Sequence, residues 1–361
     1  MIVEHLELVD IRNYEAATFD LQPGTTVILG DNGHGKTNLA EALAYLATLS
    51  SFRGVPTDAL VRVGADRGVI RATIRDDDGR QSLIEAELAV GGRNRVQVNR
   101  QRLPRVRDLL GTMRVTVFSP DDLVIVKGGP GDRRRFLDDT LVALAVKYDA
   151  IRLEVERVVK QRNTVLKSVA SQRGAGAGHG DLEATLDVWD AKLADVGGRL
   201  AHARTTLVDR LSPMVTQAYR DLAGTATTVV LDYVAPWQTD GLVAALAASR
   251  ADDTRRGITT VGPHRDDLVV TLNGLSSRTH ASQGEQRTLS LSLRLAAHRL
   301  VTERVDSAPV LVLDDVLSEL DDHRAVALLD HLPAGQVVIT SATKIPGLVD
   351  HELHIVDGRL A

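Results

Sequence analysis

The stretch Gly30-Asp31-Asn32-Gly33-His34-Gly35-Lys36-Thr37 follows the pattern G-x-x-x-x-G-K-[ST] of a phosphate-binding loop. The apolar run 25–29 before it predicts a short buried strand, and residues 38–44 after it predict a helix. Its glycines let backbone N–H groups surround a phosphate chain, and the helix N-terminus adds partial positive charge. A glycine-rich turn that only caps a helix is the alternative. Because strand, loop and helix occur in the order that the motif requires, we favour phosphate binding.

The end of this loop and a distant acidic pair define the chemistry expected at the site. In such loops the lysine contacts the β- and γ-phosphates of a nucleotide, and the next hydroxyl holds Mg²⁺. Lys36 and Thr37 take these positions. The apolar run 310–313 ends in Asp314, expected to support Mg²⁺, and Asp315, expected to orient the attacking water. A strand that merely ends at a turn would look the same, but the phosphate-binding loop in the same chain favours a nucleotide site.

Composition limits the classes of protein that the chain can belong to. Its 361 residues allow one large or two smaller domains, and 43% apolar with 25% charged residues is ordinary for a globular protein. The absence of cysteine excludes disulfides, thiol catalysis and cysteine-based zinc sites. No run of 18 apolar residues and no signal peptide is found, so we expect a cytoplasmic protein without a membrane partner. The net charge of −5 means that nucleic acid must be contacted by a local patch.

Periodicity along the chain predicts an α/β lobe interrupted by a helical one. Strands are expected within 2–29, at 68–75, 82–90, 95–98, 113–118, 227–234, 267–272, 310–313, 336–340 and 353–356. Helical spacing dominates from 121 to 253, where two antiparallel helices flank a glycine-rich connector at 174–180. We therefore expect one lobe made of residues 1–118 and 258–361, and a mainly helical lobe of residues 119–257.

A helix start at Ser282 has two interpretations. Ser282 and Glu285 have the S-x-x-E spacing of a capping box, which alone indicates a well-capped helix. Alternating leucines at 289–295 would by themselves also permit a strand. The functional interpretation is a second phosphate-binding helix terminus, with the Ser282 hydroxyl and the Gly284 N–H presented to an anion.

The order of these elements resembles an ABC-type ATPase head, and within that superfamily the chain is similar to the RecF family of bacterial recombination-repair proteins, related to SMC heads. The resemblance covers nearly the whole length. Its specific markers are the strings around Gly-Pro-His-Arg and Pro-x-x-Arg-Arg-x-Phe-Leu-Asp. The matching segments are Ile11-Arg12-Asn13-Tyr14, Gly30–Thr37, Ser50-Ser51-Phe52-Arg53, Gly129–Asp138, Gly262–Leu268, Ser282–Arg287 and Leu313–Asp321.

The resemblance implies an ATP-dependent DNA-binding protein and a weak, DNA-stimulated ATPase. It implies that the signature residues of one head, Ser282, Gln283, Gly284 and Glu285, complete the Mg²⁺–ATP site of a second copy in a head-to-tail dimer, with Asp321 in the D-loop. It also implies binding to DNA at single-strand gaps, and work with RecR and RecO in loading RecA.

Three departures from ABC ATPases concern the catalytic site. Thr340-Ser341 stand where transporter-type ATPases carry a histidine, so a histidine contact to the γ-phosphate is not expected. The catalytic acid is Asp315 rather than glutamate, which favours a slow switch over a pump. No glutamine is found to link Mg²⁺ to the helical lobe, although residues 118–121 are the expected place.

Clustered arginines are the candidate DNA contacts. Six of them fall within 15 residues without an acid among them: Arg93, Arg95, Arg100, Arg102, Arg105 and Arg107. On strands, positions 93, 95 and 107 share one parity and 100 and 102 the other, so a hairpin turn is needed to present most of them together. Such a patch would supply phosphate contacts; a solvated hairpin is the alternative. Arg133–Arg135 form a second candidate, which pairing with Asp138 and Asp139 would explain equally well.

Two rival functions remain open at this stage. The ATP-hydrolysing subunit of an ABC transporter would need a coupling surface for a transmembrane partner, and the Gly-Pro-His-Arg string and the missing histidine argue against it. The second rival is a scaffold that binds ATP without hydrolysing it, and a measurement of ATP hydrolysis would distinguish it from an ATPase.

Overall fold

The computed structural model describes residues 1–171, 179–345 and 350–361, with the backbone alone for residues 179–181. The chain divides into two compact units. The head unit comprises residues 1–123, 214–227 and 282–361, and the helical unit comprises residues 124–213 and 228–281. Both ends of the chain therefore contribute to the head unit.

The unit boundaries differ from those expected at 118 and 258. Residues 258–281 group with the helical unit because β10 (Asp267–Leu272) pairs along its length with β9 (Val229–Val234). Residues 214–227 group instead with the head unit, where Leu222 joins an apolar core with the parallel strands. A strand pattern alone does not say which sheet a strand joins, and this is why the second boundary was misplaced.

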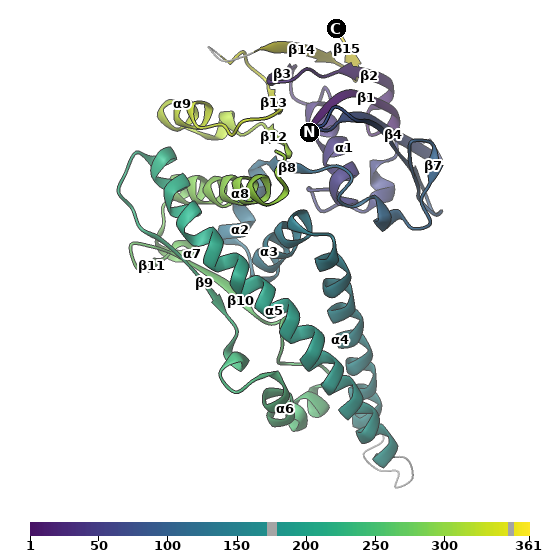
Figure 1. Ribbon diagram of the computed structural model, residues 1–361, viewed down its shortest axis with the longest axis vertical. Coiled ribbons are helices and arrows are strands. Elements are labelled where there is room, and N and C mark those ends of the chain that lie inside the picture. The colour runs from purple at the N-terminus through teal and green to yellow at the C-terminus, as the bar shows by residue number, and fades with distance from the viewer. Residues whose placement is uncertain (172–178, 346–349) are drawn as a thin grey trace. The chain divides into compact units, whose positions relative to one another are not determined.

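A mixed, largely parallel sheet in the head unit positions the candidate site (Figure 1). Its order is β15-β14-β3-β13-β12-β8, and the strands from β14 to β8 run parallel. The strands are β3 (Thr25–Leu29), β8 (Val115–Phe118), β12 (Val310–Asp314), β13 (Val337–Ser341), β14 (His351–Val356) and β15 (Arg359–Leu360). Because parallel strands end at one edge of a sheet, the residues that follow β3, β8 and β12 meet there.

An antiparallel sheet of order β2-β1-β4-β5-β6-β7 forms the rest of the head unit's strand structure. Its strands are β1 (Ile2–Ile11), β2 (Tyr14–Asp20), β4 (Arg67–Arg75), β5 (Gln81–Ala89), β6 (Arg95–Val98) and β7 (Gln101–Arg102). The predicted hairpin and the strand at 95–98 are confirmed. Only β1 and β2 of the strands expected within 2–29 pair with each other, because β3 is almost continuously buried and joins the parallel sheet.

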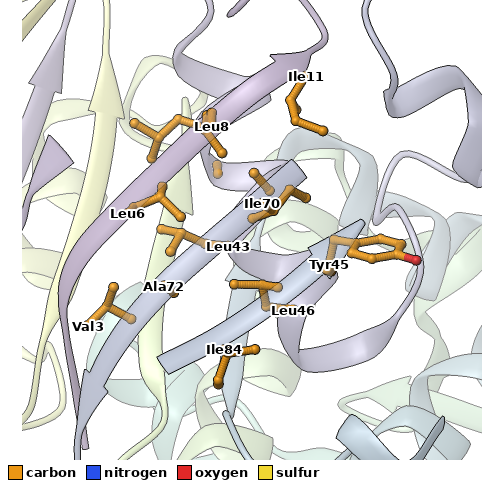
Figure 2. Close-up of a cluster of buried hydrophobic side chains, with 14 of the residues drawn as sticks. Val3, Leu6, Leu8, Ile11, Leu43, Tyr45, Leu46, Ile70, Ala72 and Ile84 are labelled. Carbon is orange, nitrogen blue, oxygen red and sulfur yellow. The ribbon is translucent and has the colours of Figure 1, made fainter. Parts of the chain in front are cut away.

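Alternate residues of β4 and β5, and Val3, Leu6, Leu8 and Ile11 of β1, are buried in one core with helix α1 (Lys36–Thr48). Figure 2 shows part of this core, with Leu6 and Leu8 from β1, Ile70 and Ala72 from β4, Ile84 from β5, and Leu43 and Leu46 from α1. The helix that follows the phosphate-binding loop is therefore fixed by apolar packing along its length, which holds the loop at a defined place.

Two further helices belong to the head unit, α8 (Gln283–Val305) and α9 (Asp322–Asp330). Leu289, Leu291, Leu293 and Leu295 are all buried in α8, so their alternation reflects a helix covered on several sides rather than a strand. Short 3₁₀ helices lie at Thr57–Leu60, Val106–Leu109, Pro120–Leu123 and Leu317–Glu319.

The helical unit is built on long helices and a small sheet. Its helices are α2 (Val124–Lys127), α3 (Pro130–Leu144), α4 (Lys147–Ser171), α6 (Leu242–Arg256) and α7 (Ser277–His280), with a 3₁₀ helix at Pro236–Gln238. Most of α5 (His179–Ala223) belongs to it, and the sheet has the order β11-β10-β9, with β11 at Leu275–Ser276. No helix in the described ranges is both long and apolar enough to cross a bilayer.

Ion pairs show that α4 and α5 are antiparallel, as predicted. Arg162 of α4 pairs with Asp190 of α5 at 2.5 Å, and Glu154, earlier in α4, pairs with Arg199, later in α5, at 3.5 Å. Arg162 is fully buried and also binds Asp253 at 2.7 Å, so each buried charge is compensated. The connector predicted at 174–180 lies outside the described residues up to 178, and its last two residues begin α5.

Candidate nucleotide-binding site

A cavity of about 440 Å³ lies in the head unit. Four segments line it: the glycine-rich loop with the start of α1, Phe52–Arg53, Ser119–Asp121, and Asp314–Asp315. The structure thus brings Lys36, Thr37 and the acidic pair together, as the sequence predicts. The parallel sheet explains the meeting, because three of the four segments directly follow β3, β8 and β12.

The turn between β1 and β2 braces the loop on one side. The Tyr14 hydroxyl donates a hydrogen bond to the carbonyl of Gly35 at 2.8 Å, and the Asn13 side-chain amide donates to the carbonyl of His34 at 3.0 Å. Gly35 has φ of +113°, and a Cβ there would come within 2.8 Å of the Tyr14 hydroxyl. Only glycine serves at this position, since both the backbone conformation and the space exclude a side chain.

The turn between β14 and β15 braces the loop on the other side. The backbone N–H of Gly358 donates to the carbonyl of His34 at 3.0 Å, and a Cβ on Gly30 would lie 2.3 Å from the carbonyl oxygen of Ile355. The C-terminal strands therefore approach the loop backbone as closely as glycine permits. This second brace was not predicted from the sequence.

A buried ion pair holds the segment that includes Arg53 at the cavity. The Arg12 guanidinium donates two hydrogen bonds to the carboxylate of Glu41, at 2.8 and 2.9 Å, and Glu41 is fully buried in α1. The Ser51 hydroxyl also donates to Glu41, and its oxygen accepts from the N–H of Arg53 at 3.0 Å. Arg12 and Ser51 belong to motifs that the sequence analysis identified without giving them a role.

Lys36 and Thr37 both face polar groups within the site. The Lys36 ammonium donates to the carbonyls of Gly30 and Asp31 at 2.6 and 2.9 Å, which keeps the positive charge inside the loop. The Thr37 hydroxyl donates to the Asp314 carboxylate at 3.0 Å. The Lys36 ammonium and the Thr37 hydroxyl thus belong to residues that line the cavity.

The two acids differ in surroundings. Asp314 is buried at the end of β12, and burial raises the pKa of its carboxyl; the hydroxyls of Thr340 and Thr37 oppose this shift, and the charge of Asp315 adds to it. Asp315 is half-buried and has φ of +52°, a left-handed conformation that is uncommon for non-glycine residues. Such strain at a cavity is typical of functional positions.

Thr340 organises both acids, although the sequence analysis noted it only as a replacement for histidine. Its hydroxyl donates to Asp314 at 2.8 Å and accepts from the N–H of Asp315 at 3.0 Å. The sequence pattern that could have predicted this role is the position of Thr340 near the end of β13, the strand that pairs with β12.

The oxygen groups at the site match the preference of Mg²⁺. Magnesium is usually held by one or two carboxylates together with substrate phosphates and water. Thr37 and Asp314 offer a hydroxyl and a buried carboxylate 3.0 Å apart. No cluster of three or more acidic or histidine side chains suitable for a metal occurs in the described ranges, so phosphate oxygens would have to supply the remaining ligands.

Ser119–Asp121 form one wall of the cavity, at the place where the resemblance to ABC ATPases would put a glutamine. Asp122 accepts from the N–H of Ser119 at 3.0 Å and from the Arg294 guanidinium of α8 at 2.6 and 3.0 Å. The exposed residues of this wall are Pro120 and Asp121, and neither is a glutamine.

The predicted signature residues lie apart from this cavity. Ser282 is the exposed N-cap of α8: its hydroxyl accepts from the N–H of Glu285 at 3.3 Å, and the Glu285 carboxylate accepts from the N–H of Ser282 at 2.7 Å. The capping box is therefore confirmed. None of the described residues lining the cavity comes from 282–287. Asp321 is the N-cap of α9.

All six arginines of the predicted DNA patch are exposed. Asn99 and Arg100 form a two-residue turn, both with positive φ, so Arg95 and Arg102 share one face of the sheet despite their different parity. Two carboxylates from outside residues 93–107 lie beside the patch. Arg95 lies 3.6 Å from Glu87, and Arg105 lies 2.9 Å from Asp108.

The second arginine candidate is corrected by the structure. Arg133 is buried and makes a bidentate pair with Asp267 at 2.7 and 2.8 Å, so it is unavailable to DNA. Asp138, expected as an internal partner of this segment, instead pairs with Arg204 at 2.8 Å. Arg135 remains exposed.

The fold and the site define an ATPase head of the kind found in ABC and SMC proteins. The Smc head domain from Pyrococcus furiosus superimposes with a TM-score of 0.57 at 15% identity, covering 99% of this chain and 94% of that chain, a likeness of fold alone. The family model RecF/RecN/SMC N terminal domain matches residues 2–345. The chain is 44% identical to the DNA replication and repair protein RecF of Streptomyces avermitilis, over 97% of this chain and 96% of that protein.

Two solved structures of the recombination mediator protein RecF in the RecFOR pathway, RecF-ATPrS and RecF-ATP, match with a TM-score of 0.90 at 30% identity. They cover 99% of this chain and 97% and 96% of theirs. The chain belongs to the RecF family of DNA replication and repair proteins. The transporter alternative is therefore set aside.

Proposed function

We propose that this chain is an ATP-driven DNA clamp of recombinational repair, with slow hydrolysis that releases it. The observation that carries the proposal is the meeting of Lys36, Thr37, Asp314 and Asp315 around one cavity, while Ser282 stays exposed elsewhere on the same unit. The cavity would hold ATP. A related structure described as RecF-ATP supports this choice of nucleotide.

In the proposed site, Lys36 binds the β- and γ-phosphates, and the loop N–H groups from Gly30 to Thr37 surround them. Thr37 and Asp314 hold Mg²⁺, which supplies positive charge against the phosphate oxygens. Asp315 orients and polarises the water that attacks the γ-phosphorus. Thr340 fixes the backbone of Asp315, so the water-binding carboxylate keeps one position.

In the proposed dimer, each bound ATP contacts both copies of the chain and so links them. The exposed turn Ser282–Glu285 of one head would contact the γ-phosphate held by the other head, where the α8 N-terminus contributes partial positive charge. Because each copy offers one loop and one signature turn, the two composite sites are related by twofold symmetry. Loss of the γ-phosphate removes the shared ligand and opens the dimer.

The closed dimer would bind gapped DNA, with Arg93, Arg95, Arg100, Arg102, Arg105 and Arg107 as phosphate contacts, and DNA would stimulate the weak ATPase. Together with RecO and RecR it would promote loading of RecA at single-strand gaps. Membership of the RecF family and the RecFOR structures support this role.

The variant Ser282→Arg tests the proposal. Its own phosphate-binding loop is untouched, so ATP should bind the monomer normally, while the bulky cation occupies the place where the opposing γ-phosphate docks. We expect ATP-dependent dimerisation, measured by sedimentation, and ATP-dependent DNA binding to be abolished together. Thr18→Arg, at an exposed residue of β2, is the matched control and should dimerise normally. If the Ser282→Arg protein still dimerises when ATP is added, the model in which two heads share each nucleotide is wrong.

A further inference from the structure

Arg324 reaches the signature turn from a neighbouring helix. It lies in the first turn of α9, and a Cβ on Gly284 would come within 3.1 Å of its Nη1 atom. The Asp321 carboxylate fixes it there, accepting from the Arg324 N–H at 2.9 Å and from Nη1 at 2.6 Å. The D-loop acid and the signature glycine are thus joined through one guanidinium.

The charges at this turn make a cation necessary for anion binding. Glu285 and Asp321 each place a carboxylate at a helix N-terminus, α8 and α9 respectively. These two negative charges would repel a phosphate approaching Ser282. Arg287 of α8 is paired with the carboxylate of Glu319 and also donates to its carbonyl at 3.1 Å.

Arg324 keeps hydrogen-bonding capacity that its contacts do not use. Its side chain is 29% exposed. Nε is buried without a partner among the described residues, so the capacity that an incoming phosphate could use belongs to the terminal nitrogens. Within the described ranges, the only acceptor for the guanidinium is the Asp321 carboxylate, which Nη1 contacts. The planar guanidinium matches the geometry of a phosphate, to which it donates two hydrogen bonds.

We propose that Arg324 is an ATP-binding residue in trans, whose guanidinium contacts the terminal phosphate of the nucleotide bound by the loop of the opposing head. This rests on the proposed function, because it requires the two-headed nucleotide site. It also gives Gly284 a role, since any side chain at that position would displace the guanidinium.

Mixed dimers test whether Arg324 acts across the interface. Arg324→Ala alone should bind ATP as a monomer, but its ATP-dependent dimerisation and hydrolysis should each fall about tenfold or more. Lys36→Ala should fail in ATP binding. Mixed in equal amounts, the two variants form dimers in which one site combines an intact loop with an intact Arg324. Hydrolysis by the mixture should then exceed that of either variant alone and stay below the wild-type rate, since each mixed dimer has one complete site.

A second mixture separates failure of this inference from failure of the proposed function. Lys36→Ala mixed with Ser282→Arg also restores one complete site if the nucleotide is shared. Recovery there, without recovery in the Arg324→Ala mixture, shows that Arg324 acts within its own head and overturns the inference alone. Recovery in neither mixture overturns the shared site, and the role of Arg324 with it. Arg324→Gln, which keeps a donor for Asp321, replaces the alanine variant if that protein does not fold.

Discussion

The hydroxyl oxygen of Thr340 lies 3.0 Å from the amide nitrogen of Asp315 and accepts its hydrogen bond. The same hydroxyl donates its proton to Asp314 at 2.8 Å. One side chain on β13 therefore bonds both to Asp314, the last residue of β12, and to Asp315, which follows it. It also stabilises the left-handed backbone of Asp315, whose φ is +52°. In this chain a threonine therefore contacts both acids of the candidate site from the strand end where the resemblance to transporter-type ATPases would place a histidine.

Removing this hydroxyl should slow turnover more than it weakens binding. Thr340→Val keeps the branched shape but leaves the N–H of Asp315 with only the longer contact to the Thr340 carbonyl, at 3.3 Å. Loss of a buried hydrogen bond costs about 1–3 kcal/mol, so kcat should fall about tenfold or more with KM for ATP little changed. Thr340→Ser restores the hydroxyl and should restore kcat. Steady-state hydrolysis measures both constants, and a valine variant with the wild-type kcat would contradict this role.

Asp315→Asn should separate nucleotide binding from hydrolysis. Asparagine keeps the size and the backbone contacts of Asp315 but lacks the charge that polarises the attacking water. ATP and Mg²⁺ should still bind, because Lys36, Thr37 and Asp314 are unchanged, while hydrolysis is abolished. The ATP-bound dimer should persist, and DNA complexes should dissociate more slowly when followed by filter binding. Dissociation as fast as that of the wild type, or faster, would show that hydrolysis does not control release.

The parts of the site that the sequence predicts are those encoded in short, contiguous patterns. The loop Gly30–Thr37 shows itself by its glycines and by the strand and helix beside it. Asp314 and Asp315 follow a wholly apolar run, which marks the end of a buried parallel strand. The Ser282–Glu285 capping box is a local geometry, so spacing alone suffices.

The parts that the sequence leaves undetermined are contacts between distant segments. Arg12 and Glu41 pair across 29 residues, and Thr340 and Asp314 across 26, and no local periodicity reports either pairing. The carboxylate of Glu87 beside Arg95 comes from the neighbouring strand, so an acid-free stretch of sequence became a partly neutralised patch. For Thr340 with Asp314 and for Arg95 with Glu87, strand register decides which side chains meet, whereas Arg12 and Glu41 meet because helix α1 packs beside the turn that follows β1.

The salt dependence of DNA binding tests the arginine patch. Replacing Arg93, Arg95, Arg100 and Arg102 by Gln should weaken binding. On duplex DNA, the log–log salt slope should decrease by about 0.9 for each phosphate that the variant no longer neutralises. We expect Arg95 to contribute least, because Glu87, which also pairs with Arg67, lies 3.6 Å from it. The control removes the same charge from exposed arginines of the helical unit: Arg157, Arg199, Arg255 and Arg256. Equal slopes in the patch variant and wild type would place the DNA elsewhere, with Arg135 next to be tested.

A buried histidine in α8 should make the protein less stable in mild acid. His298 is almost fully buried, with Nδ1 3.0 Å from the Thr116 hydroxyl, and Nε2 has no partner among the described residues. Burial, reinforced by the charge of Arg299, lowers the pKa of His298 to about 4. Burial likewise lowers the pKa of His264 to about 4. Both imidazoles are therefore neutral in the folded protein at neutral pH.

The sign of the resulting pH dependence follows from proton uptake. Between pH about 6.5 and about 4, the unfolded chain binds a proton at position 298 that the folded chain does not, so the free energy of unfolding falls as the pH falls. The contribution is at most about 1.4 kcal/mol per pH unit for this histidine. His298→Gln cannot titrate, and its stability should decline less steeply between pH 6.5 and 5 in urea titrations followed by circular dichroism. The difference between the two proteins isolates His298 from His264 and the carboxylates. Parallel stability curves would show that His298 takes up its proton without unfolding.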